Sequence, residues 1–150
     1  MDRSPALGKY SHKKIEQVYL VVARYTEIRI RKSNGECTLT LKIGKGEDRF
    51  EKEVPIPLSG YLDLSRQSKL RLLKTRYKVP YKKYVIEVDC FVGKLKGLKI
   101  AEIEFDSDKE ASSFVPPEWL GREITNDERF RNSTLALRGV PEKSQSKSIS

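Results

Sequence analysis

Histidine and cysteine are scarce in this chain of 150 residues, which contains one histidine and two cysteines. A single histidine, His12, excludes His-rich metal sites and argues against acid–base catalysis by histidine. Cys37 and Cys90 each share the apolar face of an alternating segment. We therefore predict that both are buried structural thiols, because free cysteine behaves as a small hydrophobe.

Long apolar runs are missing too. No stretch approaches the ~20 apolar residues that span a bilayer, and residues 1–16 hold no apolar run of the kind found in a signal peptide. These absences predict a cytoplasmic protein that makes no membrane contact. The length and a hydrophobic content of 37% predict one globular domain over residues 1–139. Within it, residues 1–14 form a polar N-terminal segment, and residues 140–150 form a disordered tail.

The net charge of +9 is the one feature of the composition that favours a nucleic-acid partner. Residues 1–14 and 138–150 together hold five of the nine excess positive charges. Between them, acidic residues are interleaved with basic ones. This distribution argues against a broad nucleic-acid surface.

Seven segments alternate apolar and polar residues with period two, which is the mark of strands with two different faces. Asn34-Gly35 predicts a hairpin turn, because this pair supplies the positive φ that a tight turn needs. Three short helices are expected: one over residues 57–67, one begun by the capping box Ser107-x-x-Glu110, and one opened by Thr125-x-x-Glu128. The predicted fold class is α+β, an antiparallel meander or barrel with a few helices outside. The strand segments are 15–23, 27–32, 37–43, 49–54, 73–79, 84–91 and 97–105.

Like charges occupy alternate positions on the polar faces of these strands. The common interpretation is the solvated outer face of an antiparallel sheet. The sorting of bases and acids onto separate strands counts against it, because like charges two residues apart repel. The other interpretation closes the sheet into a barrel whose inward face holds a polyphosphate and a divalent metal. The groups are Arg29/Arg31, Glu51/Glu53, Lys74/Arg76, Glu87/Asp89 and Glu102/Glu104, with Lys42 and Arg49 beside them.

Several motifs together resemble the CYTH superfamily, the triphosphate tunnel metalloenzymes, and in particular small bacterial tripolyphosphatases. The resemblance covers residues 15–137 and implies a closed or nearly closed antiparallel tunnel with charged residues inside. It also implies a metal-dependent triphosphatase that uses Mg²⁺ or Mn²⁺ and acts on tripolyphosphate or another triphosphate. The motifs are IEQVYL (15–20), RIR (29–31), TLTLK (38–42), R-x-E-x-E (49–53), KTRYKV (74–79), EVDCF (87–91), GLKIAEIEF (97–105) and PPEWLGREITNDERFRNSTLA (116–136).

Site roles follow from the same resemblance. The implied phosphate-binding residues are Arg29, Arg31, Lys42, Arg49, Lys74 and Arg76. The implied metal ligands are Glu102, Glu104, Asp89 and Glu87. The implied catalytic residues are Lys74, Arg76, Glu51 and Glu53.

One motif of the family has no counterpart here. Its first strand carries E-x-E-x-K, whereas the only acid in residues 1–14 is Asp2. We expect either that the true start lies upstream or that the strand is absent. In the second case activity would be weak, and unpaired strand edges would promote a homodimer or strand exchange. Two alternative functions stay open: a catalytically impaired polyphosphate-binding, nucleotide-binding or regulatory module, and a protein that binds RNA 5′-triphosphates.

Overall fold

The computed structural model describes residues 5–141, and seven strands in this range form one antiparallel sheet. Their bounds are β1 (His12–Val22), β2 (Thr26–Ser33), β3 (Glu36–Ile43), β4 (Phe50–Pro55), β5 (Arg71–Tyr81), β6 (Tyr84–Val92) and β7 (Lys99–Ile103). The order across the sheet is β4-β3-β2-β1-β5-β6-β7. The predicted number of strands and their antiparallel arrangement are confirmed for the described residues.

Tight turns set the register of the hairpins. Asn34 and Gly35, with φ of 50° and 81°, join β2 to β3 as the Asn-Gly pair predicts. The turn between β5 and β6 lies between the paired residues Tyr81 and Tyr84. Within this turn Lys82 takes a φ of 53°. A β-bulge between Tyr19 and Val21 interrupts the pairing of β1 with β2. Bulges increase the local twist of a strand, and this one lies in the central strand of the sheet.

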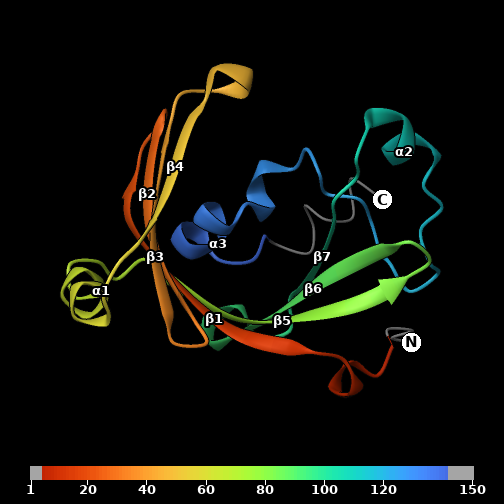
Figure 1. The fold of residues 1–150 in the computed structure, drawn as a ribbon, viewed down its shortest axis with the longest axis horizontal. Coiled ribbons are helices and arrows are strands. Elements are labelled where there is room, and N and C mark those ends of the chain that lie inside the picture. The colour runs from red at the N-terminus through yellow and green to blue at the C-terminus, as the bar shows by residue number, and fades with distance from the viewer. Residues whose placement is uncertain (1–4, 142–150) are drawn as a thin grey trace.

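The sheet is strongly curved, and helices lie on both of its faces (Figure 1). Helix α1 (Leu58–Ser65) packs on the convex face, where Tyr61 joins a core with Val18, Ile30 and Cys37. Helix α3 (Asn132–Arg138) lies on the concave face instead, so the prediction that the helices lie outside is wrong for α3.

Helix α3 packs on an apolar patch of the concave face. Its buried residues Leu135 and Ala136 pack against Tyr19, Leu72 and Phe91. These three side chains come from β1, β5 and β6 and interrupt the row of charged residues. Burial of this apolar surface places α3 where the sequence pattern predicted only an external helix.

A second convex core forms over β5 and β6 from Val79, Ile86 and Val88. Leu7 and Tyr10 pack against it, so part of the N-terminal segment that was predicted to be a polar loop is structured. That segment contains η1 (Leu7–Lys9), and β1 begins already at His12.

The Ser107 cap is confirmed: Ser107 Oγ accepts a hydrogen bond of 3.1 Å from the backbone N–H of Glu110 and begins α2 (Asp108–Ser113), while the Glu110 carboxylate accepts from the backbone N–H of Asp106. The prediction that Thr125 opens the last helix is wrong. Thr125 Oγ1 donates to a Glu123 carboxylate oxygen at 3.0 Å, and α3 begins at residue 132. Three further 3₁₀ turns are η2 (Gly46–Asp48), η3 (Gly93–Leu95) and η4 (Glu128–Phe130).

Strands β4 and β7 form the two edges of the sheet, and no pairing joins them within residues 5–141. Closure of the barrel is therefore not confirmed. Most of the predicted tail, residues 142–150, lies outside the described residues. No helix in the described part of the chain has the length and apolarity required to cross a membrane.

Candidate active site on the concave face

Strand register gathers the predicted charged residues on the face that carries α3. Lys42 pairs with Glu51, Arg76 with Asp89, and Glu87 with Glu102. Lys74 on the same face reaches the first residue of α3, so these charges line the concave side of the sheet. The alternative of a plain solvated outer face therefore does not hold, although Glu51, Glu53, Glu102 and Glu104 near the sheet edges are exposed.

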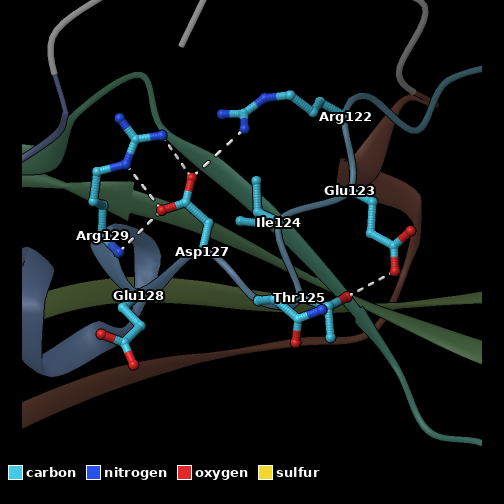
Figure 2. A pocket seen from close by; sticks show the side chains of 8 residues that line it. Arg122, Glu123, Ile124, Thr125, Asp127, Glu128 and Arg129 are labelled. Carbon is cyan, nitrogen blue, oxygen red and sulfur yellow. Dashed lines mark hydrogen bonds and ion pairs between the residues drawn. The ribbon is translucent and has the colours of Figure 1, made fainter. Parts of the chain in front are cut away.

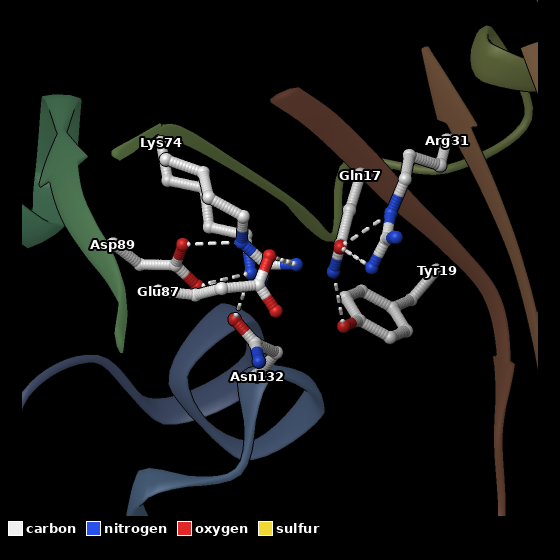
Figure 3. A network of polar contacts seen from close by, with 8 residues as sticks. Gln17, Tyr19, Arg31, Lys74, Glu87, Asp89 and Asn132 are labelled. Carbon is white, nitrogen blue, oxygen red and sulfur yellow. Dashed lines mark hydrogen bonds and ion pairs between the residues drawn. The ribbon is translucent and has the colours of Figure 1, made fainter. Parts of the chain in front are cut away.

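A buried ion cluster is centred on Asp89 (Figure 3). Arg76 donates to both of its carboxylate oxygens, from Nε to Oδ1 at 2.7 Å and from NH2 to Oδ2 at 2.9 Å. Lys74 Nζ lies 2.8 Å from Oδ2, and only 1% of the Lys74 side chain is exposed. Arg76 also reaches Glu87, with NH1 3.5 Å from Oε2. Asp89 was predicted as a metal ligand, but both of its oxygens are bound to cations here.

Burial and charge set the protonation of this cluster. Burial lowers the pKa of Lys74, and the nearby charges of Arg76 and Arg31 lower it further, against the pull of Asp89. Burial would raise the pKa of Asp89, but the hydrogen bonds from Arg76 and the charge of Lys74 outweigh it and lower that pKa. The cluster therefore holds one carboxylate between two cations.

Three cations on β2 and β3 form no comparable ion pair, although Glu27 and Glu51 act on Lys42, and Glu53 acts on Arg31, in the direction that raises their pKa values. Among residues 5–141, no ion pair joins Arg29, Arg31 or Lys42 to a carboxylate. The buried Nε of Arg29 has no hydrogen-bond partner. Burial lowers the pKa of Arg31, and repulsion from Arg29 and Arg76 lowers it further. Burial and the charge of Arg29 likewise lower the pKa of Lys42. A bound anion would stabilise the charged forms of these side chains, so this face has the chemistry to hold an anion.

Two buried residues of β1, Gln17 and Tyr19, adjoin the cations of this face, although the sequence assigned them no role beyond their place in the motif at 15–20. Gln17 Oε1 accepts hydrogen bonds from Nε of Arg31 at 2.8 Å and also from its NH2. Gln17 Nε2 donates to the Tyr19 hydroxyl at 2.9 Å. Burial raises the pKa of Tyr19 to about 12, so this hydroxyl stays neutral near pH 7. The signals in the sequence were the motif at 15–20 and the position of both residues on the same strand face as Ile15.

The acids of β4 lie opposite Thr40 and Lys42 of β3. Glu53 accepts a hydrogen bond of 3.2 Å from the Thr40 hydroxyl. Glu51 is the cross-strand neighbour of Lys42 and lies 3.3 Å from Arg49 NH2. Arg49 precedes β4, is exposed and pairs with Glu51, although its charge also helps to lower the pKa of the half-buried Lys42.

Carboxylates near the end of β6 and β7 are the remaining predicted metal ligands. Glu87 and Glu102 are direct cross-strand neighbours, and Glu104 follows β7. Glu87 and Glu104 line one surface pocket together with Lys78 and Lys83. In the described part of the chain, no three acidic, histidine or cysteine residues converge closely enough to bind a metal by themselves. The two adjacent glutamates repel each other, and a hard divalent cation that also binds substrate oxygens requires only one or two carboxylates. The residues therefore fit a partial metal site.

A separate pocket is lined by residues 122–129, in the loop that leads to α3 (Figure 2). Arg129 donates to both carboxylate oxygens of Asp127, from Nε at 2.9 Å and from NH2 at 2.7 Å. Arg122 NH1 lies 3.6 Å from the same carboxylate. The hydrogen bonds from Arg129 lower the pKa of Asp127 to about 2. Asp127 therefore forms ion pairs with both arginines, although the buried NH1 of Arg122 has no hydrogen-bond partner.

Comparison with known proteins places this fold and site in a family. No family model matches the chain. It is 39% identical over 114 residues to an inorganic triphosphatase of Nitrosomonas europaea, covering 74% of this chain and 75% of that protein. It is 36% identical over 122 residues to an inorganic triphosphatase of Acetivibrio thermocellus, covering 79% of this chain and 77% of that protein.

A solved structure supports the same relationship. The crystal structure of an inorganic triphosphatase superposes with a TM-score of 0.75 at 32% sequence identity, over 93% of this chain and 94% of the other. The sequence identity, the coverage and the shared fold agree. The chain therefore belongs to the inorganic triphosphatase family of the CYTH superfamily.

Proposed function

We propose that the concave face binds inorganic tripolyphosphate or a related triphosphate together with a divalent metal, and hydrolyses its terminal phosphoanhydride bond. The relatives named inorganic triphosphatase support this activity. The observation that carries the proposal is the group of Arg29, Arg31 and Lys42, three cations on one face that form no ion pair with a carboxylate among residues 5–141.

Polyphosphate fits this group for a physical reason. Crowding and burial disfavour the charged forms of Arg31 and Lys42, as their lowered pKa values indicate. A bound anion would relieve that repulsion and restore their pKa values. Guanidinium groups also offer paired N–H donors that match phosphate oxygens, and each charge-assisted contact contributes about 1.5–3 kcal/mol.

Lys74 and Arg76 would face the phosphate chain from the opposite wall. Asp89 holds both of them in fixed positions, so their ordering costs nothing further when the substrate binds. In this proposal Asp89 positions the side chains of Lys74 and Arg76. Arg49 lies at the exposed rim of the site. Lys74 and Arg76 stabilise the negative charge that develops on the phosphate oxygens.

Glu51 and Glu53 would assist the attacking water. Water oxygen forms a bond to the terminal phosphorus, and the bridging P–O bond breaks to release orthophosphate and diphosphate. One of these carboxylates would accept a proton from that water, which is general-base catalysis. Thr40 fixes the Oε1 oxygen of Glu53 for this task.

Glu87, Glu102 and Glu104 would hold Mg²⁺ or Mn²⁺ in concert with the phosphate oxygens. The adjacent like charges of Glu87 and Glu102 support this assignment. When bound, such an ion polarises the phosphoryl group.

A phosphate-release assay tests the proposal. We expect release from tripolyphosphate that requires Mg²⁺ or Mn²⁺ and that EDTA abolishes. Lys42→Met should raise KM about tenfold or more, because it removes one charge-assisted contact. Lys52→Met is the matched control, because Lys52 is exposed and pairs with Leu41 on the opposite face of the sheet.

Other outcomes identify the alternatives. Metal-dependent binding without turnover would mean a sensor or regulatory module and would refute hydrolysis. Equal binding of RNA with and without a 5′ triphosphate, with a steep salt dependence, would indicate a general RNA-binding protein. Unchanged kinetics in Lys42→Met would refute the assignment of this wall to phosphate.

A further inference from the structure

Two cations on the concave face are held by uncharged amide oxygens. Arg31 donates from Nε and NH2 to Gln17 Oε1. Lys74 Nζ donates to Asn132 Oδ1 at 3.3 Å. Figure 3 shows both amides beside the cations that they contact, one on the central strand and one at the start of α3.

The orientation of Gln17 is fixed by its partners. Its side chain is fully buried, with no exposed surface. Its oxygen faces the guanidinium of Arg31, and its nitrogen donates to the Tyr19 hydroxyl. A flipped amide would turn two N–H groups toward a guanidinium that is itself only a donor. Gln17 can therefore hold Arg31 in only one direction.

An amide oxygen fixes direction without neutralising charge. Asp89 shows the contrast, because one carboxylate there compensates Lys74 and Arg76. A glutamate at position 17 would have the same shape as glutamine and would still accept from Arg31, but it could not donate to Tyr19, so the Tyr19 hydroxyl would have to donate to it instead. It would add a full negative charge beside Arg31, where no carboxylate forms an ion pair within residues 5–141.

Donors for a ligand remain on both cations. Gln17 occupies two of the five guanidinium N–H groups of Arg31, which leaves three. Asp89 and Asn132 occupy two of the three ammonium N–H groups of Lys74, which leaves one. The amides thus fix both side chains and leave part of their donor capacity unused by amide or carboxylate oxygens, with the Lys74 ammonium also lying over the Phe91 ring.

We propose that Gln17 and Asn132 are positioning residues of the triphosphate site, which orient Arg31 and Lys74 through neutral oxygens and keep their positive charge for the substrate. This inference rests on the proposed triphosphate binding. It explains why a fully buried polar residue of β1 lies on the charged face, and it gives the first residue of α3 a role beyond packing.

The test compares Gln17→Glu with wild type by calorimetry with Mg²⁺ and tripolyphosphate, by thermal unfolding, and by steady-state kinetics. We expect Gln17→Glu to unfold at the same or a higher temperature, because an ion pair to Arg31 replaces an amide contact. We expect its Kd and KM for tripolyphosphate to rise about tenfold or more, with a smaller change in kcat. Asn132→Asp should weaken binding in the same direction.

Matched controls exist elsewhere in the chain. Gln67→Glu and Asn34→Asp make the same changes at exposed positions, after α1 and in the β2–β3 turn. Both should bind like wild type. Gln17→Met provides a second variant that removes the oxygen without adding charge. It should raise KM less than Gln17→Glu does, since Arg31 keeps its charge and loses only its orientation.

The outcomes separate this inference from the proposed function. Wild-type binding with an equal Kd in folded Gln17→Glu would overturn the positioning role and leave triphosphate binding intact. A loss of thermal stability in Gln17→Glu with unchanged Kd and KM would make Gln17 merely structural. Absence of binding by the wild-type protein would overturn the proposed function, and the positioning role with it.

Discussion

The two walls of the concave face balance their charges in different ways. On the β5–β6 wall, Lys74 and Arg76 share Asp89, and Arg76 also reaches Glu87. On the β2–β3 wall, Arg29, Arg31 and Lys42 form no ion pair with a carboxylate in the described part of the chain. One wall is internally compensated, and the other retains excess positive charge.

This difference separates stability from binding. The compensated wall contributes to the fold, because its carboxylate and its cations depend on one another once buried. The uncompensated wall is a cost to the fold, because its half-buried cations repel. That cost is recovered when an anion binds, so binding energy should concentrate on β2 and β3.

The largest expected effect is on the compensated wall. Asp89→Asn leaves Lys74 and Arg76 without a counter-charge in a site where Asp89 is 2% exposed. We expect the free energy of unfolding to fall by about 3–5 kcal/mol, the usual cost of breaking a buried pair on one side. Urea denaturation measures it. Asp63→Asn, which affects an exposed pair with Arg66, should leave stability nearly unchanged. Equal stability of Asp89→Asn and wild type would contradict the comparison.

Acid unfolding gives an independent measure of the same wall. The pKa of Asp89 is lowered in the folded protein, so its contribution is present above its ordinary pKa of 3.8. That contribution is lost as the pH falls through the lowered folded value. Wild type should therefore lose more stability than Asp89→Asn on acidification below about pH 4. Parallel curves for the two proteins would argue against a lowered pKa.

On the β2–β3 wall, we expect a smaller effect, which is a dependence of tripolyphosphate affinity on pH. Burial and Arg29 lower the pKa of Lys42, so it loses its proton below the ordinary value of 10.5. Affinity for tripolyphosphate should then fall about tenfold as the pH rises through that lowered value, since one charged contact disappears. Calorimetry between pH 7 and 10 measures the decline. Lys42→Arg should make this decline in affinity less steep, because arginine stays charged over this range. Part of the decline should remain, because the pKa of Lys74 is lowered as well. A decline equally steep in both proteins would exclude Lys42 as the cause.

The smallest expected effect is that of replacing Arg29 on the free energy of unfolding. Arg29→Met removes a cation that forms no ion pair with a carboxylate in residues 5–141 and relieves repulsion on Arg31 and Lys42. We expect the free energy of unfolding to stay within ~1 kcal/mol of wild type, or to rise. A loss as large as that expected for Asp89→Asn would show that the two walls do not differ.

Alternation predicted much of this arrangement. It placed Arg29 and Arg31 on one face and Ile28 and Ile30 on the other, because the side-chain period of a strand is two. The Asn-Gly turn then fixed the register between β2 and β3. Sequence reasoning could not show which face is concave, because curvature depends on the whole sheet and on where α3 packs.

Long-range contacts account for what was missed. Asn132 meets Lys74 across 58 residues of sequence, and the motif at 116–136 that contains it gave no sign of that contact. Gln17 was hidden for another reason: both faces of β1 are covered, so Gln17, Val18 and Tyr19 are all buried and the strand shows little alternation. The assignments of Glu51, Glu102 and Glu104 to catalysis and metal binding stay predictions.

Calorimetric titration of Mg²⁺ and tripolyphosphate into wild type, Arg29→Met and Arg66→Met tests the central claim most directly. Arg29 belongs to the uncompensated wall, whereas Arg66 lies at the exposed end of α1 and pairs with Asp63. The account predicts a loss of roughly tenfold to a hundredfold in affinity for Arg29→Met, about 1.5–3 kcal/mol, and no change for Arg66→Met. Wild-type affinity in a folded Arg29→Met protein would contradict the claim that the unpaired cations of β2 and β3 form the triphosphate site.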